Sequence, residues 1–541
     1  MNRRQAIACA AAALLAGCGR REGVPDLEGG WVGANAERGH ALRDGRVPRV
    51  QPGVAVRRTS VAVVGAGVAG LATARALQRS GIDDVRVFEL EDAAGGNARG
   101  HVMGNQPCPL GAHYLPVPGP DAHEVAQLLR ELGVARSEFG RTVYDERTLC
   151  HAPQERLFID GSWQEGLLPA TASASGRAQA RRFSALVSKA QADAGFAMPT
   201  LRRPWNAGLA ALDALSFDQW LDAQGLDDAH LRWYLDYCCR DDYGAGSAQV
   251  SAWAGLHYFA SRHGFRAPGD AADDAEDRVL TWPQGNAWLT ERMAASLGER
   301  VTCGAVVSRV SESRHEVALD VFDARSGVAQ RWVAQRVVMC TPLFVSARLL
   351  EAPQAALMQS LQRMRYAPWL VTNLQLREPL ADRIGPAAAW DNVLYSSAAL
   401  GYVDAGHQNL GLAPRTNVLT HYWALGGDSA QALAAARRRL FDAPWREWAD
   451  AVIADLARAH PDLPRKVARA DLMRYGHAMS IPVPGLRGDA ALAALARADA
   501  GSRIHFAHAD LSAYSVFEEA FTRGTLAAGQ VARALGARRT D

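Results

Sequence analysis

The sequence has very few lysines and no excess of either charge. Lys189 and Lys466 are the only lysines in its 541 residues, so arginine carries nearly all of the positive charge, and chemistry that requires a lysine has little to draw on. The 59 lysines and arginines nearly balance the 57 aspartates and glutamates. Such a balance leaves no electrostatic footprint for a nucleic-acid partner, and we expect none. The 48% of hydrophobic residues is typical of an ordered globular protein.

The eight cysteines lack the spacing of a metal site. Neither a CxxC pair nor a Cys/His pattern occurs, so the sequence offers no metal-binding motif. In an oxidising compartment, a disulfide among the cysteines after residue 18 would be compatible with the sequence, although adjacent cysteines such as Cys238 and Cys239 seldom pair. The sequence leaves the pairing open.

The first 18 residues have the form of an export signal. Arg3 and Arg4 precede an apolar run, Ala6–Ala16, that is too short to span a membrane. The arginine pair and the closing Leu15–Cys18 resemble a twin-arginine signal peptide that ends in a bacterial lipoprotein cleavage box. This resemblance implies a lipid on Cys18 and a periplasmic, membrane-anchored lipoprotein. The twin-arginine route exports folded proteins, so the signal also hints at a cofactor.

A strand, a helix and a second strand begin at residue 61. Val61–Val64 and Val85–Phe88 are short apolar runs, and Val68–Arg79 has helical periodicity. The strand-to-helix turn carries a GxGxxG motif, whose glycines permit the tight turn, the close approach of a pyrophosphate and the packing of helix on strand. The helix N-terminus would then face the phosphates. The predicted cofactor contacts on this turn are Gly65, Gly67, Ala69 and Gly70.

An acid and a second glycine turn point to the identity of the dinucleotide. Glu89 closes the second strand, where a carboxylate can accept hydrogen bonds from both ribose hydroxyls and would repel a 2′-phosphate, so NADP is disfavoured. The next turn, Gly95–Arg99, resembles the second glycine turn of the flavin amine oxidase superfamily, which includes protoporphyrinogen oxidases and carotenoid desaturases. The resemblance implies that this turn passes the diphosphate and that the cofactor is FAD. Its predicted contacts are Gly95, Gly96, Asn97 and Arg99.

Two further segments resemble the same superfamily. Leu110–Tyr114 resembles the loop that runs past the flavin, which implies that Gly111 and Ala112 contact the cofactor. Trp282–Gly285 resembles a helix entry of the family. Downstream of it, Val307 lies where the family holds adenine through the backbone.

The closing flavin motif departs from the family pattern. Ile504–Asp510 resembles a motif that usually reads Phe-Ala-Gly followed by an acid. His508 stands in place of the glycine, and the acid comes one place later, as Asp510. Asp510 is a predicted cofactor contact, but whether it meets phosphate or ribitol stays open. The small-residue helix that follows would point its N-terminus at the flavin pyrimidine ring, where reduced flavin is negatively charged.

These segments imply an α/β fold in which a Rossmann-like FAD-binding domain is interleaved with a mixed α+β substrate domain. The expected boundaries are an export signal at 1–18, a tether and irregular lead-in at 19–57, FAD-binding parts at 58–150, 276–345 and 471–541, a helical substrate-domain part at 151–275 and a sheet part at 346–470.

The helical insertion contains aromatic and charged side chains. They either line a pocket for a cationic substrate or form a packed helical core with solvated charges, and the sequence favours the second reading. The charged members are Asp236, Asp241, Asp242, His257 and Arg262.

The resemblance implies an FAD-dependent oxidoreductase in which the substrate lies against the flavin and passes a hydride to it. Many amine-oxidising members carry a lysine near the flavin on the strand that corresponds to Trp369–Leu376, and this strand has none. No cysteine follows Cys340, so the covalent attachment known in the family is absent, and FAD is expected to bind noncovalently. We expect imidazole and phenol side chains at the flavin edge, with histidine suited to act as a base near neutral pH. The catalytic candidates are His113, Tyr114, Tyr475 and His477.

Three functions remain open from sequence. The first is oxidation of a C–N bond in an amine or polyamine, with oxygen or a membrane quinone as the electron acceptor. The second is C–C desaturation of an apolar substrate, which the missing lysine favours. The third is a flavin-binding lipoprotein without turnover, which would have a blocked flavin face.

Overall fold

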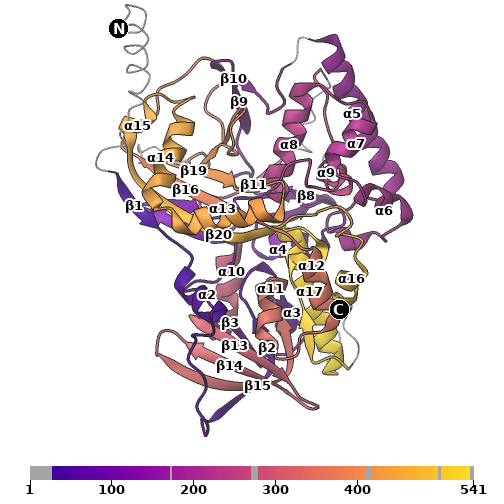
Figure 1. The fold of residues 1–541 in the computed structure, drawn as a ribbon, viewed down its shortest axis with the longest axis vertical. Helices are drawn as coiled ribbons and strands as arrows, with labels where there is room; N and C mark the ends of the chain where they lie inside the picture. The colour runs from indigo at the N-terminus through magenta and orange to yellow at the C-terminus, as the bar shows by residue number, and fades with distance from the viewer. Residues whose placement is uncertain are drawn as a thin grey trace, which may run out of the picture.

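The computed structural model describes residues 27–170, 173–262, 264–269, 278–409, 417–497 and 501–536. Two large sheets lie toward opposite ends of the long axis, and helices pack against both (Figure 1). The first sheet has seven strands and the second has eight. This arrangement confirms the α/β fold with a Rossmann-like FAD-binding part.

The seven-stranded sheet contains the predicted strand-helix-strand unit. Its parallel strands are β12, β3, β2, β15 and β21, and β14 and β13 continue from β15 in antiparallel fashion. Residues 61–63 of β2 are fully buried, as a parallel strand covered on both faces requires. The strands are β2 (Val56–Val64), β3 (Val85–Glu89), β12 (Val301–Cys303), β13 (Ala305–Glu312), β14 (Val317–Asp323), β15 (Val328–Met339) and β21 (Ile504–Phe506).

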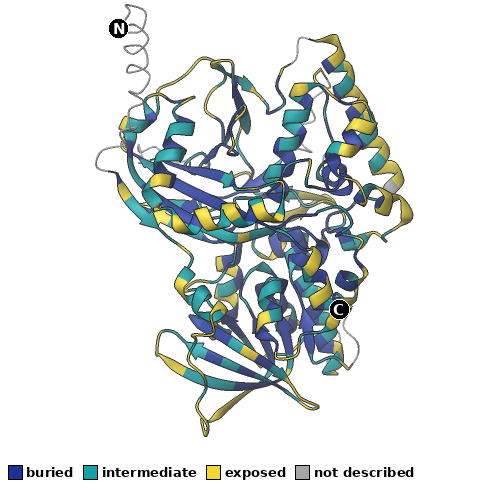
Figure 2. Ribbon diagram, in the orientation of Figure 1, coloured by how far each residue is buried: buried dark blue, intermediate teal, exposed yellow. Residues whose placement is uncertain are grey.

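Helices α3 and α17 cover this sheet and touch each other at close range. A Cβ at Gly524 of α17 would lie 2.2 Å from the carbonyl oxygen of Ala69 in α3, so a residue without a side chain is required where the helices meet. Figure 2 shows the dark blue, buried interior that results. The helices of this region are α3 (Val68–Arg79), α10 (Ala287–Leu297), α11 (Leu343–Leu349), α12 (Ala355–Arg363), α16 (Ala490–Leu495) and α17 (Phe517–Ala534).

The eight-stranded sheet joins segments that lie far apart in the sequence. Its order is β1-β20-β16-β19-β18-β17-β9-β10, and α13 (Ala430–Asp442) and α14 (Trp445–Leu456) pack against it. The strands are β1 (Glu28–Trp31), β9 (Glu155–Ile159), β10 (Ser162–Glu165), β16 (Tyr366–Leu376), β17 (Asp391–Leu394), β18 (Tyr402–Asp404), β19 (Val418–Ala424) and β20 (Val467–Ser480).

A helical layer stands beside the eight-stranded sheet (Figure 1). In α8 the Asp228 side chain accepts a hydrogen bond from the Leu231 N–H at the start, and Gly244 with φ +71° ends the helix, as helix caps do. Gly244 also allows close contact with β16, because a Cβ there would lie 2.6 Å from Nε1 of Trp369. The helices are α5 (Ala174–Ala194), α6 (Ala207–Asp213), α7 (Phe217–Ala223), α8 (Ala229–Tyr243) and α9 (Ala252–Ala260).

Shorter elements complete the chain. The small strands are β4 (Gly100–Met103), β5 (Gln106–Pro109), β6 (Tyr114–Pro116), β7 (Ala135–Glu138), β8 (Arg141–Tyr144) and β11 (Val279–Thr281). The remaining helices are α2 (Ala36–Arg43), α4 (His123–Glu131), α15 (Leu463–Lys466) and the 3-10 helices η1 (Thr200–Arg202), η2 (Gly298–Arg300) and η3 (Ala509–Ser512).

The chain organisation differs from the expectation in three places. The described part of 19–57 is not an irregular lead-in, because β1 pairs with β20 and α2 follows it. The segment Glu-Gly-Gly-Trp of β1 has no alternating apolar pattern, and only its backbone pairing defines it as a strand. The helical part expected at 151–275 opens with β9 and β10 of the large sheet. Strand β20 crosses the expected boundary between residues 470 and 471.

The structure also shows the state of the described cysteines and the length and apolar character of the described helices. All six described cysteines are free thiols, so no disulfide joins them. Cys18 and the rest of the expected export signal lie outside the described residues. Within the described ranges, no helix combines the length and the apolar character that crossing a bilayer requires.

Candidate active site

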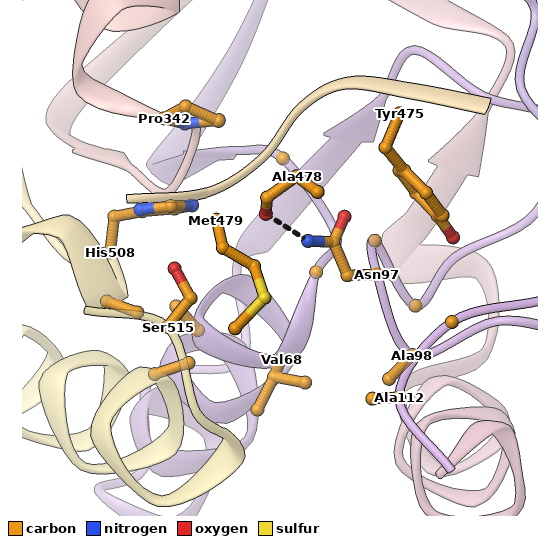
Figure 3. Close-up of a pocket in the computed structure, with 18 of the residues that line it drawn as sticks. Val68, Asn97, Ala98, Ala112, Pro342, Tyr475, Ala478, Met479, His508 and Ser515 are labelled. Atoms are coloured by element: carbon orange, nitrogen blue, oxygen red, sulfur yellow. Dashed lines mark hydrogen bonds between the residues drawn. The ribbon is translucent and has the colours of Figure 1, made fainter. Parts of the chain in front are cut away.

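A cavity of about 520 Å³ extends from the carboxyl ends of β2, β3 and β15 to the eight-stranded sheet and the helices α8 and α17. Its two ends differ in character. One end is lined by glycine turns, backbone and the Glu89 carboxyl, and the other by aromatic rings with Asp241, Asp242 and Glu518. Figure 3 shows the middle of the cavity, where Tyr475, Ala478 and Met479 of β20 lie among residues of turns and helix ends, including Asn97 and His508.

The two predicted glycine turns lie against each other and form a floor without side chains. A Cβ at Gly96 would lie 3.0 Å from the Cα of Gly67, and Gly96 has φ +59°. Gly95 has φ +124°, and a Cβ there would lie 2.7 Å from the carbonyl oxygen of Ala98. Close approach and left-handed backbone therefore both demand glycine here. Gly65, Gly67, Gly95 and Gly96 all line the cavity.

The N-terminus of α3 opens onto this floor with free backbone donors. Gly67 is the N-cap residue, and no side chain caps the helix, so the first N–H groups are available to an anion. Gly70 does not line the cavity. A Cβ at Gly70 would lie 1.9 Å from the carbonyl oxygen of Gly65, so Gly70 allows the helix to start against the strand. Ala69 lines the cavity beside it.

Glu89 lies at the end of β3 and lines the cavity. Its Oε2 accepts a hydrogen bond from the Ala66 N–H at 2.7 Å, and its Oε1 accepts one from the Glu91 N–H at 2.9 Å. Burial raises the pKa of the carboxyl, although these two hydrogen bonds oppose the rise. Each oxygen keeps a further acceptor position, so the carboxylate can receive two hydroxyl groups. Val307 lines the same end of the cavity.

Of the remaining predicted contact residues, three line the cavity and one supports it from outside. Asn97, Gly111 and Ala112 line the cavity, and the Asn97 side chain donates to the carbonyl of Ala478 at 2.6 Å (Figure 3). Arg99 does not line the cavity. Its Nε donates to the Gly96 carbonyl at 3.0 Å, so Arg99 supports the second glycine turn from behind. Sequence spacing could not separate these roles.

Asp510 is buried at the edge of the cavity, and protein groups hold its carboxylate. Its Oδ2 accepts from the Leu343 N–H at 2.9 Å and from the Tyr366 hydroxyl at 2.7 Å. Burial opposes ionisation, but the neighbouring His508 and the hydrogen bonds lower the pKa of Asp510. Asp510 therefore fastens η3 to the start of α11, while it still faces the cavity.

The four catalytic candidates line the cavity, with His113, Tyr114 and Tyr475 at the aromatic end and His477 near Tyr366, which bonds to Asp510. His113 stacks on Tyr422 with ring centroids 4.4 Å apart, and the Tyr475 hydroxyl donates to the Leu110 carbonyl at 2.8 Å. His477 lies against Phe344, with centroids 4.6 Å apart. The structure therefore places all four, including Tyr114, on the cavity wall. Their catalytic roles stay predictions.

Burial changes the proton affinity of these rings. It lowers the pKa of His113 to about 3 and that of His477 to about 4, so both imidazoles are neutral near pH 7. It raises the pKa of Tyr475 to about 12. Imidazoles with so low a pKa are weak bases, so these rings are better suited to apolar and stacking contacts with a substrate than to proton transfer.

Carboxyl groups of α8 and α17 face the same end of the cavity. Asp241 and Glu518 line it, and no side chain or backbone group of another described residue bonds to either carboxyl. Burial, with the charge of Asp242 adding, raises the pKa of Asp241 to about 7. Burial likewise raises the pKa of Glu518 to about 7, against the effect of its own backbone N–H. Both carboxyls can therefore change their charge near neutral pH.

A third acid is neutralised within the cavity. Nη2 of Arg262 lies 2.9 and 3.0 Å from the two carboxylate oxygens of Asp242. The Arg262 guanidinium also stacks over Tyr258 at 4.8 Å. Within the described lining, Arg262 is the only arginine or lysine, so the unpaired charge at this end is negative.

The structure divides the charged group expected in the helical insertion. Asp241, Asp242 and Arg262 line the cavity, and the binding of a cation there stays a prediction. Asp236 instead accepts hydrogen bonds from Ser247. His257 is buried in the core, 3.0 Å from the carbonyl of Ala197.

Three residues of the cavity wall are absent from the sequence-based predictions. Glu518, Trp369 and Tyr422 all line the cavity, but none had been a candidate. Glu518 follows the closing motif on the first turn of α17, and an acid at the start of a helix that points at a cofactor was an available signal. The rings of β16 and β19 gave no such signal, because strands commonly bury aromatic residues.

The residues present fit FAD. The side-chain-free floor and the open end of α3 suit a diphosphate, the two free acceptor positions of Glu89 suit a ribose diol, and the cavity continues past them to a wall of rings. Glu89 and the backbone supply these contacts without any lysine. The fold and site together define a dinucleotide-binding flavoprotein.

Residues 68–532 match the family model described as flavin containing amine oxidoreductase. Because the match spans most of the chain, the protein belongs to this family, and its cofactor is FAD. The family's covalent cysteine has no counterpart after Cys340, which is consistent with noncovalent binding.

Individual relatives agree with this assignment. AofH of Mycobacterium tuberculosis (strain CDC 1551 / Oshkosh), provisionally named a flavin-containing monoamine oxidase, is 29% identical over 269 residues, which are 48% of this chain and 53% of AofH. The chain thus spans about half the length of this relative. Wild-type putrescine oxidase bound to putrescine superposes with TM-score 0.65 at 20% identity, covering 88% of this chain and 100% of the other. Cyclohexylamine oxidase from Brevibacterium oxydans IH-35A gives 0.60 at 17% identity, covering 88% and 99%. At these identities the two structures show the shared fold.

Proposed function

We propose that the protein is an FAD-dependent oxidoreductase that oxidises a C–N bond of a cationic amine. The observation that carries this proposal is a pair of carboxyls, Asp241 and Glu518, that have no hydrogen-bond partner among the other described residues and lie at the aromatic end of a cavity whose other end suits FAD. A buried carboxylate is costly without a partner. An ammonium group of a substrate would supply that partner.

Bound FAD would supply the acceptor for a hydride from the substrate carbon. The protein orients the substrate and keeps water away from it. His113 and Tyr422, which stack on each other, form one wall, and Trp369 and Tyr475 add further surface. The aliphatic part of an amine would lie among these rings.

The substrate nitrogen must lose a proton before hydride can leave the neighbouring carbon, because an ammonium has no lone pair to assist that departure. Asp241 suits this step, because its pKa of about 7 lets it bind the ammonium as a carboxylate and then hold the proton. The histidines suit it less, since burial lowers the pKa of both His113 and His477.

Two carboxyls favour a substrate with more than one ammonium group. The charges of Asp242 and Arg262 act on the pKa of both Asp241 and Glu518, so this ion pair lies near both. Because the pair neutralises itself, each of the other carboxyls needs its own cation. A diamine or polyamine supplies two cations in one molecule, and we place this class ahead of monoamines.

The alternative of C–C desaturation agrees less well with the cavity. An apolar substrate would leave Asp241 and Glu518 without partners in a dry site, which is unfavourable at any pH where they are ionised. A blocked flavin face, which the non-catalytic alternative requires, finds no support either, because the cavity continues beyond the glycine turns.

Anaerobic mixing tests the proposal. Purified holoprotein should lose the visible absorbance of oxidised flavin when it is mixed with putrescine or spermidine. Cyclohexylamine, with one ammonium, should act more slowly. A carotenoid or tetrapyrrole precursor should leave the absorbance unchanged. Bleaching by such an apolar donor, with none by any amine, would assign the C–C reaction instead.

We further propose that the chain is exported by the twin-arginine route and anchored through lipid on Cys18, with oxygen or a membrane quinone as the electron acceptor. The support is the order of Arg3, Arg4 and Leu15–Cys18 in the sequence. Radiolabelled palmitate should mark the wild-type protein in cells and not Cys18→Ser. Equal labelling of both would remove the anchor from the proposal.

A further inference from the structure

His508 stands where the flavin amine oxidase pattern has glycine, and its side chain faces the cavity. The residue follows β21 and is the N-cap of η3. Its ring lines the cavity and keeps 23% of its side-chain surface exposed. Figure 3 shows the ring extending from the chain into the cavity beside Pro342. A glycine at this place would have no side chain to offer there.

The cap determines which ring nitrogen carries the proton. Nδ1 of His508 accepts a hydrogen bond from the backbone N–H of Asp510 at 3.1 Å. Because an amide N–H only donates, Nδ1 of the neutral ring is the acceptor and its proton is on Nε2; a ring that is protonated beside the Asp510 carboxylate carries a proton on Nε2 as well. The carboxylate of Asp510 also lies on the Nδ1 side, with Oδ1 at 3.2 Å. Within the described residues, no protein group bonds to Nε2.

The fold places this donor near the phosphate-binding floor. Val64, Met339 and Phe506 lie side by side in the strands β2, β15 and β21. Neighbouring strands are about 4.8 Å apart, so the chain after β21 emerges about two strand spacings from the glycine turn after β2. His508 lines the cavity on the β21 side of this interval.

The cavity has little other positive charge to offer a diphosphate. Arg262 is the only arginine or lysine in its described lining, and that residue pairs with Asp242 on the substrate side. The backbone donors of α3 serve one side of the diphosphate position. The opposite side, toward β21, has the Nε2–H of His508.

We propose that His508 is a cofactor-binding residue whose Nε2–H donates to a phosphate oxygen of FAD. Its side chain thereby replaces a contact that a glycine could make only through its backbone. The inference rests on FAD binding in the proposed function but not on the identity of the amine. It assigns His508 a role in holding the cofactor and none in the oxidation.

His508→Asn separates this role from the cap. Asparagine is a good N-cap acceptor but is too short to extend a donor into the cavity. We expect the dissociation constant for FAD, measured by quenching of flavin fluorescence on the apoprotein, to rise about 10- to 100-fold, as loss of a hydrogen bond to a charged group implies. The melting temperature of the apoprotein should stay at the wild-type value. The exposed His123→Asn should change neither quantity.

Two spectra identify the atom and do not depend on affinity. In ³¹P NMR of bound FAD, His508→Asn should shift one of the two phosphorus resonances more than the other. In wild-type protein with ¹⁵N-labelled histidine, FAD should shift one Nε2 signal, and this measurement holds even if the variant folds poorly. If His508→Asn binds FAD within twofold of wild type, or if no histidine signal responds to FAD, the inference is wrong. Wild-type protein that binds no FAD at all would instead refute the proposed function.

Discussion

The cofactor end and the substrate end of the cavity are built in opposite ways. At the cofactor end, two adjacent turns and one carboxylate act through backbone geometry, and glycines with left-handed φ leave no freedom for side chains. At the substrate end, side chains from α8, α17, β16 and β19 meet Arg262, which follows α9, across hundreds of residues of sequence. The comparison indicates that binding of the cofactor is fixed by the fold, whereas the choice of substrate is set by single replaceable side chains.

The largest effect is expected at the glycine floor. In Gly95→Ala the new Cβ would lie 2.7 Å from the Ala98 carbonyl oxygen and 3.0 Å from Oγ1 of Thr290, at φ +124°. The turn cannot keep its shape, so we expect FAD binding to fall below detection in a titration of the apoprotein. Gly119→Ala is the matched control, because no atom lies within 4 Å of its Cβ position. Retention of stoichiometric FAD by Gly95→Ala would show that the floor is not rigid.

The next effect concerns the ribose carboxylate. Glu89→Ala removes both acceptor positions and also frees the Ala66 and Glu91 N–H groups. Two lost bonds to a charged group, at about 1.5–3 kcal/mol each, predict FAD affinity about 100-fold weaker or more. Equilibrium dialysis measures the change. An unchanged flavin stoichiometry at dilute protein would contradict the ribose role.

A smaller effect is expected from a substitution at the substrate end, which should change KM without changing the FAD content. Asp241→Asn removes one charge that faces the cavity, so KM for a diamine should rise about 10-fold, in line with one hydrogen bond to a charged group. FAD content should not change. Asp222→Asn, on an exposed carboxylate of α7, should leave KM unaltered. Loss of FAD from Asp241→Asn would contradict the claim that the substrate end and the cofactor end act independently.

The pH dependence of kcat/KM also tests the role of Asp241. Because the pKa of Asp241 is raised to about 7, the carboxylate that binds the ammonium is lost as pH falls through 7. We expect kcat/KM for wild type to decline on this acidic side and the decline to weaken in Asp241→Asn. An identical acidic limb in both proteins would assign that limb to another group.

The smallest effect is on stability. Folding raises the pKa of Glu518 from its ordinary 4.5 to about 7, so the folded state holds this proton more tightly than the unfolded state. Stability from this group therefore falls as pH rises from about 4.5 to 7 and is level above that. Relative to wild type, Glu518→Gln should gain about 2 °C or more in melting temperature between pH 5 and pH 8. The exposed Glu291→Gln should gain nothing.

The same division explains what the sequence could predict. The strand-helix-strand unit, both glycine turns and Glu89 are local patterns, in which spacing alone places the residues. The wall of the substrate end has no local pattern, because Trp369, Tyr422 and Glu518 come together only when separate strands and a helix pack. Sequence analysis therefore found Asp241 but ranked it with Asp236 and His257, which turn away from the cavity.

Two misplacements have local physical reasons. Arg99 belongs to the second glycine turn, but the carbonyl of Gly96 draws its guanidinium behind the turn. Strand β1 escaped detection because parallel pairing with β20 uses backbone groups of Glu28–Trp31. The pattern of side chains in the sequence predicts neither the position of the Arg99 guanidinium nor the pairing of β1.

The flavin content of reconstituted protein tests the central claim most directly. Apoprotein that has been folded, mixed with excess FAD and passed through a desalting column should emerge yellow, with one FAD per chain, and Gly95→Ala treated in parallel should emerge without colour. A folded wild-type protein that stays colourless would contradict the account, because the glycine floor and Glu89 would then hold no dinucleotide.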